Sequence, residues 1–200
     1  MKYLLSSLIY LSSVFALNAY SLDHTLSSLE WIGSKITGSH NGNIQFLSGE
    51  VLFDNKTILS GEIVVNMGTI ENEDISSEKY KGYLVDHLKS EDFFSVDSFP
   101  HAHLVILENL GDIDKNKESG FNTIIRCDLT IKGITHTIDI PMTLNVYNSH
   151  ATASGRIDID RTLYDIKYKS KSFFPDIGDK LIYDHFTLNF TIRTNRAWKN

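Results

Sequence analysis

Two histidines on one expected strand have the spacing that best suits a metal ion. His101 and His103 are separated by one residue, which puts both imidazoles on the same face of a strand. Zinc sites use this arrangement, but they require at least a third protein ligand. His87, Asp92 and Asp97 precede the pair, and nothing in their spacing fixes any of them as that ligand. We therefore favour two ordinary strand residues and keep a metal-dependent enzyme as the alternative.

A charged cluster near residue 160 offers a second constellation. Asp158, Asp160, Arg161 and Asp165 combine carboxylates with an arginine, a set that could serve acid/base catalysis. The first two alternate with isoleucines, so a solvated strand face that ends in an ion pair is the simpler explanation. The sequence contains no nucleophile elbow, phosphate-binding loop or zinc-protease motif. The chain is therefore not expected to be an enzyme or to need a cofactor.

The dominant pattern in the sequence is an alternation of apolar and polar residues with a period of two. Over residues 134–146 one face is almost entirely apolar, whereas Thr, Asp and Asn fill most of the other. Residues 125–131 alternate in the same way and meet this run at Gly133, which predicts a β-hairpin. Cys127 lies on the apolar side and is expected to be a small buried residue. The alternation recurs over residues 186–192.

Weaker strands are expected over residues 29–37, 44–53, 61–67, 101–108 and 151–160. Only residues 76–88, with Leu84 and Leu88 four apart, have a helical pattern. Pro141 inside a strand indicates an edge or a bulge. Eight strands and one helix predict an all-β sandwich or closed barrel. The helix and the acidic segment at residues 112–118 argue against an outer-membrane barrel.

The first 21 residues have the composition of a secretory signal peptide. Lys2 gives a positive start, and residues 3–17 are uncharged and largely apolar. Cleavage is expected before Leu22, with cuts after Ala16 or Ala19 as alternatives. Residues 22–200 then suit a single domain, and no other segment is apolar over the roughly 20 residues that a spanning helix needs. A periplasmic protein that is not membrane-embedded is therefore expected.

The overall charge restricts the possible partners. The formal net charge is −6, and the sequence shows no basic stripe. Nucleic acids and anionic lipid headgroups both attract cationic side chains. The sequence therefore argues against nucleic acid as a partner and against docking on anionic headgroups.

Residues 86–100 have an unusual composition, with three phenylalanines among four acids. The aromatic rings are expected to lie against an apolar surface while the carboxylates stay in water. This segment belongs to a series of motifs in which the chain resembles the YceI-like family of lipocalin-like, polyisoprenoid-binding proteins. The motifs are residues 31–35, His40-Asn41-Gly42, His87-Leu88-Lys89-Ser90, Asp92-Phe93-Phe94, Phe99-Pro100, residues 129–135, Asp160-Arg161-Thr162 and Ile177-Gly178-Asp179.

The resemblance implies an eight-stranded antiparallel, lipocalin-like barrel with one helix at its side. Such a barrel would carry or store a long isoprenoid chain, of the quinone or polyprenyl type, or another lipid in its pore. Members of the family are typically exported to the periplasm and are not known as a group for catalysis. Dimers occur among them, which makes a homodimer one expectation here.

Apolar residues on the inward faces of the strands are the candidates for contact with such a chain. An isoprenoid tail has no hydrogen-bonding groups, so a site for it must supply apolar area and exclude water. Each candidate could instead be ordinary core, as in a third hypothesis of a solid barrel that binds another protein. The candidate pore residues are Trp31, Phe46, Phe53, Ile63, Val65, Phe93, Phe94, Leu129, Ile131, Ile138, Ile140, Phe186 and Phe190.

Overall fold

The described chain consists of nine strands and one α-helix. The structure is a computed structural model that describes residues 17–112, 120–176 and 178–197. The strands are β1 (Asn18–Leu22), β2 (Ser28–Lys35), β3 (Gly38–Asp54), β4 (Thr57–Asn66), β5 (His101–Asp112), β6 (Thr123–Ile131), β7 (Ile134–Val146), β8 (His150–Asp160) and β9 (Ile182–Arg196). The helices are α1 (Glu78–Lys89) and three short 3₁₀ segments, η1 (Met67–Thr69), η2 (Arg161–Tyr164) and η3 (Gly178–Lys180).

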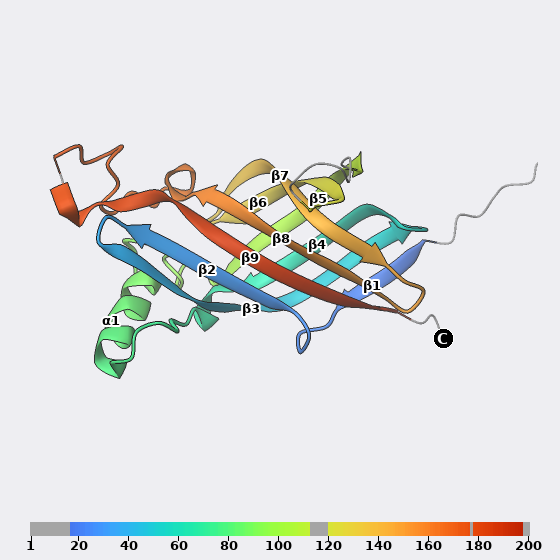
Figure 1. Ribbon diagram of the computed structural model, residues 1–200, viewed down its shortest axis with the longest axis horizontal. Helices are drawn as coiled ribbons and strands as arrows, with labels where there is room; N and C mark the ends of the chain where they lie inside the picture. Colours follow the sequence, from blue (N-terminus) through green and yellow to red (C-terminus); the bar gives the residue numbers. More distant parts are fainter. Residues whose placement is uncertain (1–16, 113–119, 177, 198–200) are drawn as a thin grey trace, which may run out of the picture.

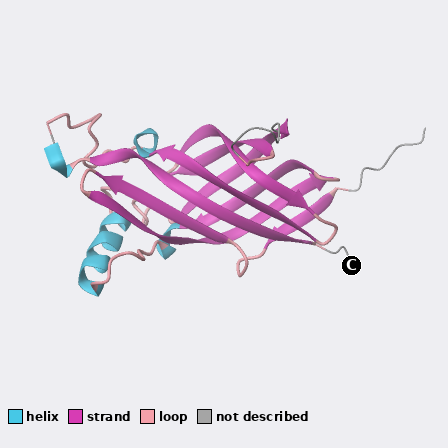
Figure 2. Ribbon diagram, viewed as in Figure 1, coloured by secondary structure: helices cyan, strands magenta, loops and turns pink. Residues whose placement is uncertain are grey.

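These strands form one antiparallel sheet that closes on itself. The strand order is β1-β3-β2-β9-β8-β7-β6-β5-β4, and β3 also pairs with β4, which joins the two ends. The result is an elongated barrel with α1 at one end and both described chain ends at the other (Figures 1 and 2). Of the two predicted architectures, the barrel is therefore the one that forms.

β1 and β2 together occupy a single position in the barrel. Both lie between β3 and β9, with β1 beside Glu50 of β3 and Thr194 of β9, and β2 beside Ile44 and Phe190 of the same strands. The barrel thus has eight strand positions, as predicted. β1 is not among the predicted strands because residues 18–21 fall within the segment assigned to the signal peptide, of which residues 1–16 lie outside the described chain.

The period-two pattern of the sequence corresponds to burial along β6. A two-residue turn connects this strand to β7, with Lys132 at φ 50° and Gly133 at φ 71°. Left-handed conformations at both turn residues match the twist of the paired strands, and the predicted hairpin is confirmed. The buried residues of β6 are Thr123, Ile125, Cys127, Leu129 and Ile131.

The barrel wall is least continuous between β7 and β8. β7 pairs with β6 along its length, but within the described chain it pairs with β8 only from Thr143 to Val146. Pro141 precedes this short ladder, so its missing N–H interrupts no bond to β8, although β7 has a neighbour on each side and is not an edge strand of the sheet. η2 packs beside β7 instead, where His136 Nε2 lies 3.1 Å from the Leu163 carbonyl oxygen.

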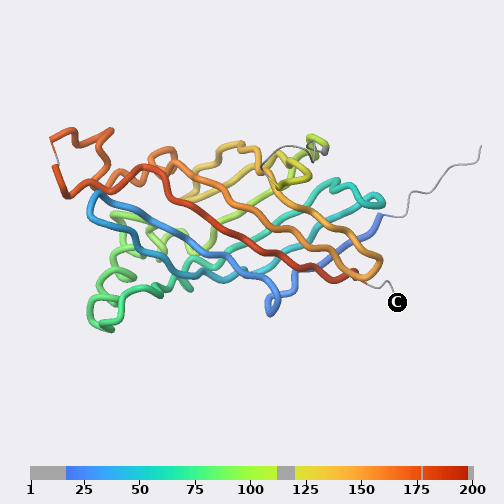
Figure 3. The backbone as a smooth tube through the Cα atoms, viewed as in Figure 1, coloured from blue at the N-terminus to red at the C-terminus, as the bar shows by residue number. Residues whose placement is uncertain are grey.

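The link that leads to α1 runs along β3 as an extra extended segment. The Glu71 and Glu73 amides donate to the Asn43 and Asn41 carbonyls, each at 3.0 Å. A Cβ at Gly42 would lie 1.8 Å from the Glu71 carbonyl oxygen, so only glycine allows this approach. The close approach gives a physical reason for the glycine in the His40-Asn41-Gly42 motif. The pairing of this link with β3 also fixes the chain just before α1, which lies at the end of the barrel (Figure 3).

Candidate ligand-binding pore

Two adjoining cavities lie inside the barrel. Their volumes are about 110 Å³ and about 130 Å³. Leu29, Val65, Leu129 and Leu188 line both cavities, so these side chains lie where the two cavities meet. We call these four residues the waist, and the cavities on its two sides the β1-end cavity and the α1-end cavity. Together they form a pore along the barrel axis.

The β1-end cavity is lined almost entirely by hydrocarbon. Its wall includes Phe53, Ile125, Ile140 and Phe190, and its polar lining residues are threonines. Cys127 lies in the core cluster around this part of the barrel and is fully buried. Burial raises the pKa of the Cys127 thiol to about 12, so the group stays uncharged near neutral pH. This half of the pore can offer apolar contact and very little hydrogen bonding.

The α1-end cavity has aromatic walls and one buried charge. Arg161 lies in its lining and is only 3% exposed. Its guanidinium donates to the carbonyls of Tyr183 and Ile182, both at 3.1 Å, and to that of Ile166 at 2.7 Å. Asp184 lies 3.5 Å away as the counter-charge. Burial lowers the pKa of Arg161, and the nearby carboxylates oppose that effect. Because Arg161 follows β8 and donates to the carbonyls of Ile182 and Tyr183, it connects the end of β8 to the start of β9.

The segment that follows α1 supplies the aromatic wall at this end. Phe93 is buried and Phe94 half-buried, and their ring centroids lie 6.2 Å apart. Phe94 also meets Phe186 of β9 edge-on at 6.2 Å, and Phe93 lies 5.8 Å from Tyr168. The carboxylates of the segment remain exposed. The segment therefore covers the end of the barrel with its aromatic side inward.

Comparison with known proteins identifies the fold family. A family model described as the YceI-like domain matches residues 20–194. The chain belongs to the YceI-like family. The predicted resemblance is thereby confirmed, although Ile177 of its last motif lies outside the described residues. Comparison with curated proteins finds no match.

Solved structures share the fold of this YceI-like protein at low sequence identity. Burkholderia cenocepacia BcnA has a TM-score of 0.64 at 18% identity, over 86% of this chain and 98% of that one. A polyisoprenoid-binding domain from Saccharophagus degradans has a TM-score of 0.60 at 14% identity, over 89% and 98%. The Campylobacter jejuni YceI protein has a TM-score of 0.54 at 13% identity, over 78% and 85%. These similarities establish the shared barrel.

The predicted pore residues converge on the two cavities, with one exception. Ile138 is absent from both linings and instead packs, partly buried, against the two core clusters. Whether the other residues contact a ligand stays a prediction. Those in the cavity walls are Trp31, Phe46, Phe53, Ile63, Val65, Phe93, Phe94, Leu129, Ile131, Ile140, Phe186 and Phe190.

Arg161 is the residue whose role the sequence interpretation missed. The prediction of a solvated ion pair is wrong for it, because it is buried and its nearest carboxylate is Asp184. Asp160 instead caps η2, accepting from the Thr162 amide at 2.9 Å. A signal was present, since Arg161 continues the inward parity of Ile159. Nothing local indicated the carbonyl groups that surround it.

The histidine pair lies on the outer face of β5. His101 and His103 share that face, with ring centroids 6.3 Å apart, and His103 Nδ1 lies 3.2 Å from Glu62. Within the described residues, no three His, Cys, Asp or Glu side chains come together as a metal site would require. The same part of the chain contains no helix with the length and apolar character needed to span a bilayer. The pore is therefore the candidate site to which the largest number of predicted site residues contribute.

Proposed function

We propose that this YceI-like protein is an exported binding protein that carries or stores a long apolar lipid in its barrel. The ligand we favour is an isoprenoid quinone or a polyprenyl chain. The observation that carries the proposal is the pair of apolar cavities joined at the waist. Relatives support it, since the similar domain from Saccharophagus degradans is described as polyisoprenoid-binding.

The dimensions of the pore suit a long chain. β9 runs past both cavities, from Ile182 at the α1 end to Thr194 at the other. At about 3.3 Å per residue and a strand tilt of about 40°, this stretch spans roughly 30 Å along the barrel axis. A ligand that filled it would bury many methylene-sized groups at roughly 0.8 kcal/mol each. Apolar contact alone could therefore offset the entropy lost on binding.

The chemistry of the lining favours binding over catalysis. Most lining side chains are aliphatic or aromatic and offer no nucleophile or proton donor. Arg161, the charged residue in the wall, already donates to three backbone carbonyls. A metal-dependent enzyme built on His101 and His103 remains the alternative, and Glu62 is the acidic neighbour it would recruit.

The test is to identify what the native protein contains. We would purify it gently from its host, extract it with organic solvent and analyse the extract by mass spectrometry. An unrelated exported protein, purified with the same tag, controls for adventitious lipid. The expected result is about one long-chain isoprenoid or similar lipid per barrel, enriched over the control. Repeated recovery of no lipid, with side chains filling the pore in a crystal structure, would contradict the proposal.

A further inference from the structure

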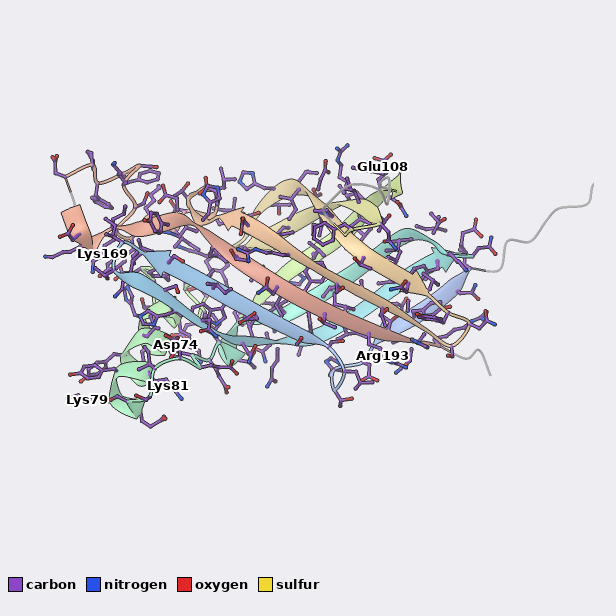
Figure 4. All side chains as sticks on the ribbon, in the orientation of Figure 1. Asp74, Lys79, Lys81, Glu108, Lys169 and Arg193 are labelled. Atoms are coloured by element: carbon purple, nitrogen blue, oxygen red, sulfur yellow. The ribbon has the colours of Figure 1, made fainter. Side chains whose placement is uncertain are left out.

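Lysine side chains lie over aromatic rings at the α1 end of the barrel. Lys79 Nζ is 5.7 Å from the centre of the Tyr83 ring, and Lys169 Nζ is 4.9 Å from that of Tyr168. A third pair, Lys167 and Phe173, is separated by 5.1 Å. Lys79, Lys81 and Lys169 all lie at this end in Figure 4, although they come from segments far apart in the sequence. The fold thus concentrates cationic and aromatic groups that the sequence keeps apart.

Large aromatic side chains at this end are exposed to solvent. Tyr80 and Tyr83 on α1 are 64% and 60% exposed, and their rings meet edge-on at 6.3 Å. Phe173 and Phe174 are 45% and 51% exposed. Four such residues around one end of a domain are more than isolated apolar positions on a surface. We define the end patch as Tyr80, Tyr83, Phe173, Phe174, Lys79, Lys167 and Lys169.

The charges of the end patch are partly neutralised by neighbouring acids. Asp165 lies 2.5 Å from the Lys167 ammonium group, and Glu78 pairs with Lys81 at 3.3 Å. In the described part of the chain, Lys79 and Lys169 form no ion pair within 4.0 Å. These two cations remain available to an external anion, even though the whole chain has a formal net charge of −6.

This composition matches what a lipid bilayer surface selects. Tyrosine places an apolar ring and a polar hydroxyl at the headgroup level, and lysine extends its stem along apolar surface while its ammonium group stays in water. Anionic headgroups add attraction for each nearby lysine. Protein–protein interfaces are instead depleted in lysine, so exposed lysines beside exposed rings fit a bilayer surface better than a protein partner.

The end patch lies beside the wall of the α1-end cavity. A groove beside it is lined by Lys167, Lys169 and Phe174 of the patch and by the carboxylates Asp92 and Asp165. Tyr168 also lines this groove, and its ring lies 5.8 Å from Phe93 in the wall of the α1-end cavity. A surface bound to the end patch would therefore face the aromatic end of the pore.

We propose that the α1 end of the barrel docks reversibly on an anionic phospholipid bilayer through the end patch. This revises the expectation that anionic headgroups are not a partner, which was based on the overall charge. Docking would place the α1-end cavity against the membrane from which a lipid ligand is taken or to which it is returned. Only this purpose rests on the proposed function, because an empty barrel would present the same patch.

Vesicle sedimentation with the mature chain tests the proposal. Phosphatidylcholine vesicles, with and without phosphatidylglycerol, would be mixed with the wild type and with Tyr83→Ser/Phe174→Ser. The control is Tyr147→Ser/Leu107→Ser, which removes side chains that are 52% and 47% exposed elsewhere on the barrel. We expect the patch variant to lose at least about tenfold in partitioning and the control to match the wild type. Lys79→Glu/Lys169→Glu should abolish the preference for phosphatidylglycerol.

The outcomes separate docking from lipid carriage. Absence of wild-type binding to either vesicle, or an equal loss in the control variant, would overturn the docking proposal. Docking by protein from which no lipid can be extracted would support the end patch while the proposed function fails. Recovery of lipid from a protein that binds no vesicle would do the reverse. Circular dichroism verifies that each variant is folded.

Discussion

The guanidinium carbon of Arg161 lies 5.7 Å from the centre of the Phe93 ring. Arg161 begins η2 and Phe93 follows α1, so this contact joins two parts of the barrel end that are far apart in the sequence. The arginine also holds the start of β9 through the carbonyls of Ile182 and Tyr183. Arg161 is thus the residue on which several elements of the α1 end converge.

Replacing this arginine should destabilise the barrel. Arg161→Met would leave three carbonyls, one of them buried, without their donor and Asp184 without its counter-charge. We expect the free energy of unfolding to fall by about 3 kcal/mol. Arg156→Met, at an exposed position on the preceding strand β8, should change it by less than about 0.5 kcal/mol. Urea denaturation measures both, and equal effects would show that the carbonyl contacts contribute little.

The two neighbouring phenylalanines should separate core from pore. Phe93→Ala removes a buried ring and should cost about 3 kcal/mol of stability. Phe94→Ala removes a half-buried ring from the cavity wall, so lipid retention should fall while stability changes by about 1 kcal/mol. Phe99→Ala, at an exposed ring, is the control. Lipid content by mass spectrometry and urea denaturation provide the two measurements, and a parallel loss of both in Phe94→Ala would make it a core residue.

The waist should determine the length of the bound chain. Val65→Phe would fill space between the two cavities, so the lipids recovered should shift to shorter chains. Val64→Phe is the matched control, because this neighbouring side chain points to the opposite face of β4. Mass spectrometry of the extracted lipids gives both distributions. Identical chain lengths in the two variants would mean that the ligand does not pass the waist.

Asp74 should make stability depend on pH in the acid range. Partial burial disfavours its charged form, but hydrogen bonds from Asn41 and His40 outweigh burial and lower the pKa to about 2. Since the unfolded value is 3.8, the contribution is complete above about pH 4 and is lost as the pH falls toward 2. Asp74→Asn should cost about 1 kcal/mol at pH 7.

Urea denaturation between pH 7 and pH 2 would measure this effect. The difference between the wild type and Asp74→Asn should shrink as the pH falls from 4 to 2. Asp97→Asn, at an exposed site after α1, serves as the control. A difference that stays constant over this range would show that Asp74 does not act through its charge.

β1 bears on where the predicted signal peptide would be cleaved. A cut after Ala16 would leave Asn18–Leu22 intact, whereas a cut before Leu22 would remove Tyr20, which is 2% exposed and meets Phe53 edge-on at 4.9 Å. We therefore expect the mature chain to begin at Leu17, which its intact mass would reveal. A chain that starts at Leu22 should be less stable by about 3 kcal/mol than one that starts at Leu17. Equal stability would mean that β1 is dispensable.

Local patterns were sufficient to predict most of the barrel. Residues 134–146 coincide with β7, because alternation records directly which face is buried. The helix expected over residues 76–88 is α1, shifted by one or two residues at its ends. Closure itself is a long-range property, and it was the family resemblance that favoured a barrel over a sandwich.

The features that were missed depend on contacts between distant segments. Two of the three carbonyls that hold Arg161 lie about twenty residues further along the chain, and the residues next to it in sequence do not indicate them. The end patch likewise draws on α1 and on the segment around Phe173, which lie far apart in the sequence. β1 escaped prediction because an apolar leader and a short buried strand have similar composition. Pore parity was predictable for strand residues, and Ile138, whose parity is also inward, packs against the two core clusters beside the cavities.

The place of β9 between two neighbours has a consequence for how the chain assembles. This last strand lies between β8 on one side and β1 and β2 on the other, and Leu29 pairs with Phe190. An N-terminal fragment, however long, therefore leaves the cylinder open until the final residues have been synthesised. Such sequence-distant pairing also slows folding, typically to milliseconds or seconds. β1 and β2 lack one of their two pairing partners until β9 is in place. A C-terminal truncation should therefore affect the first strands as much as the last.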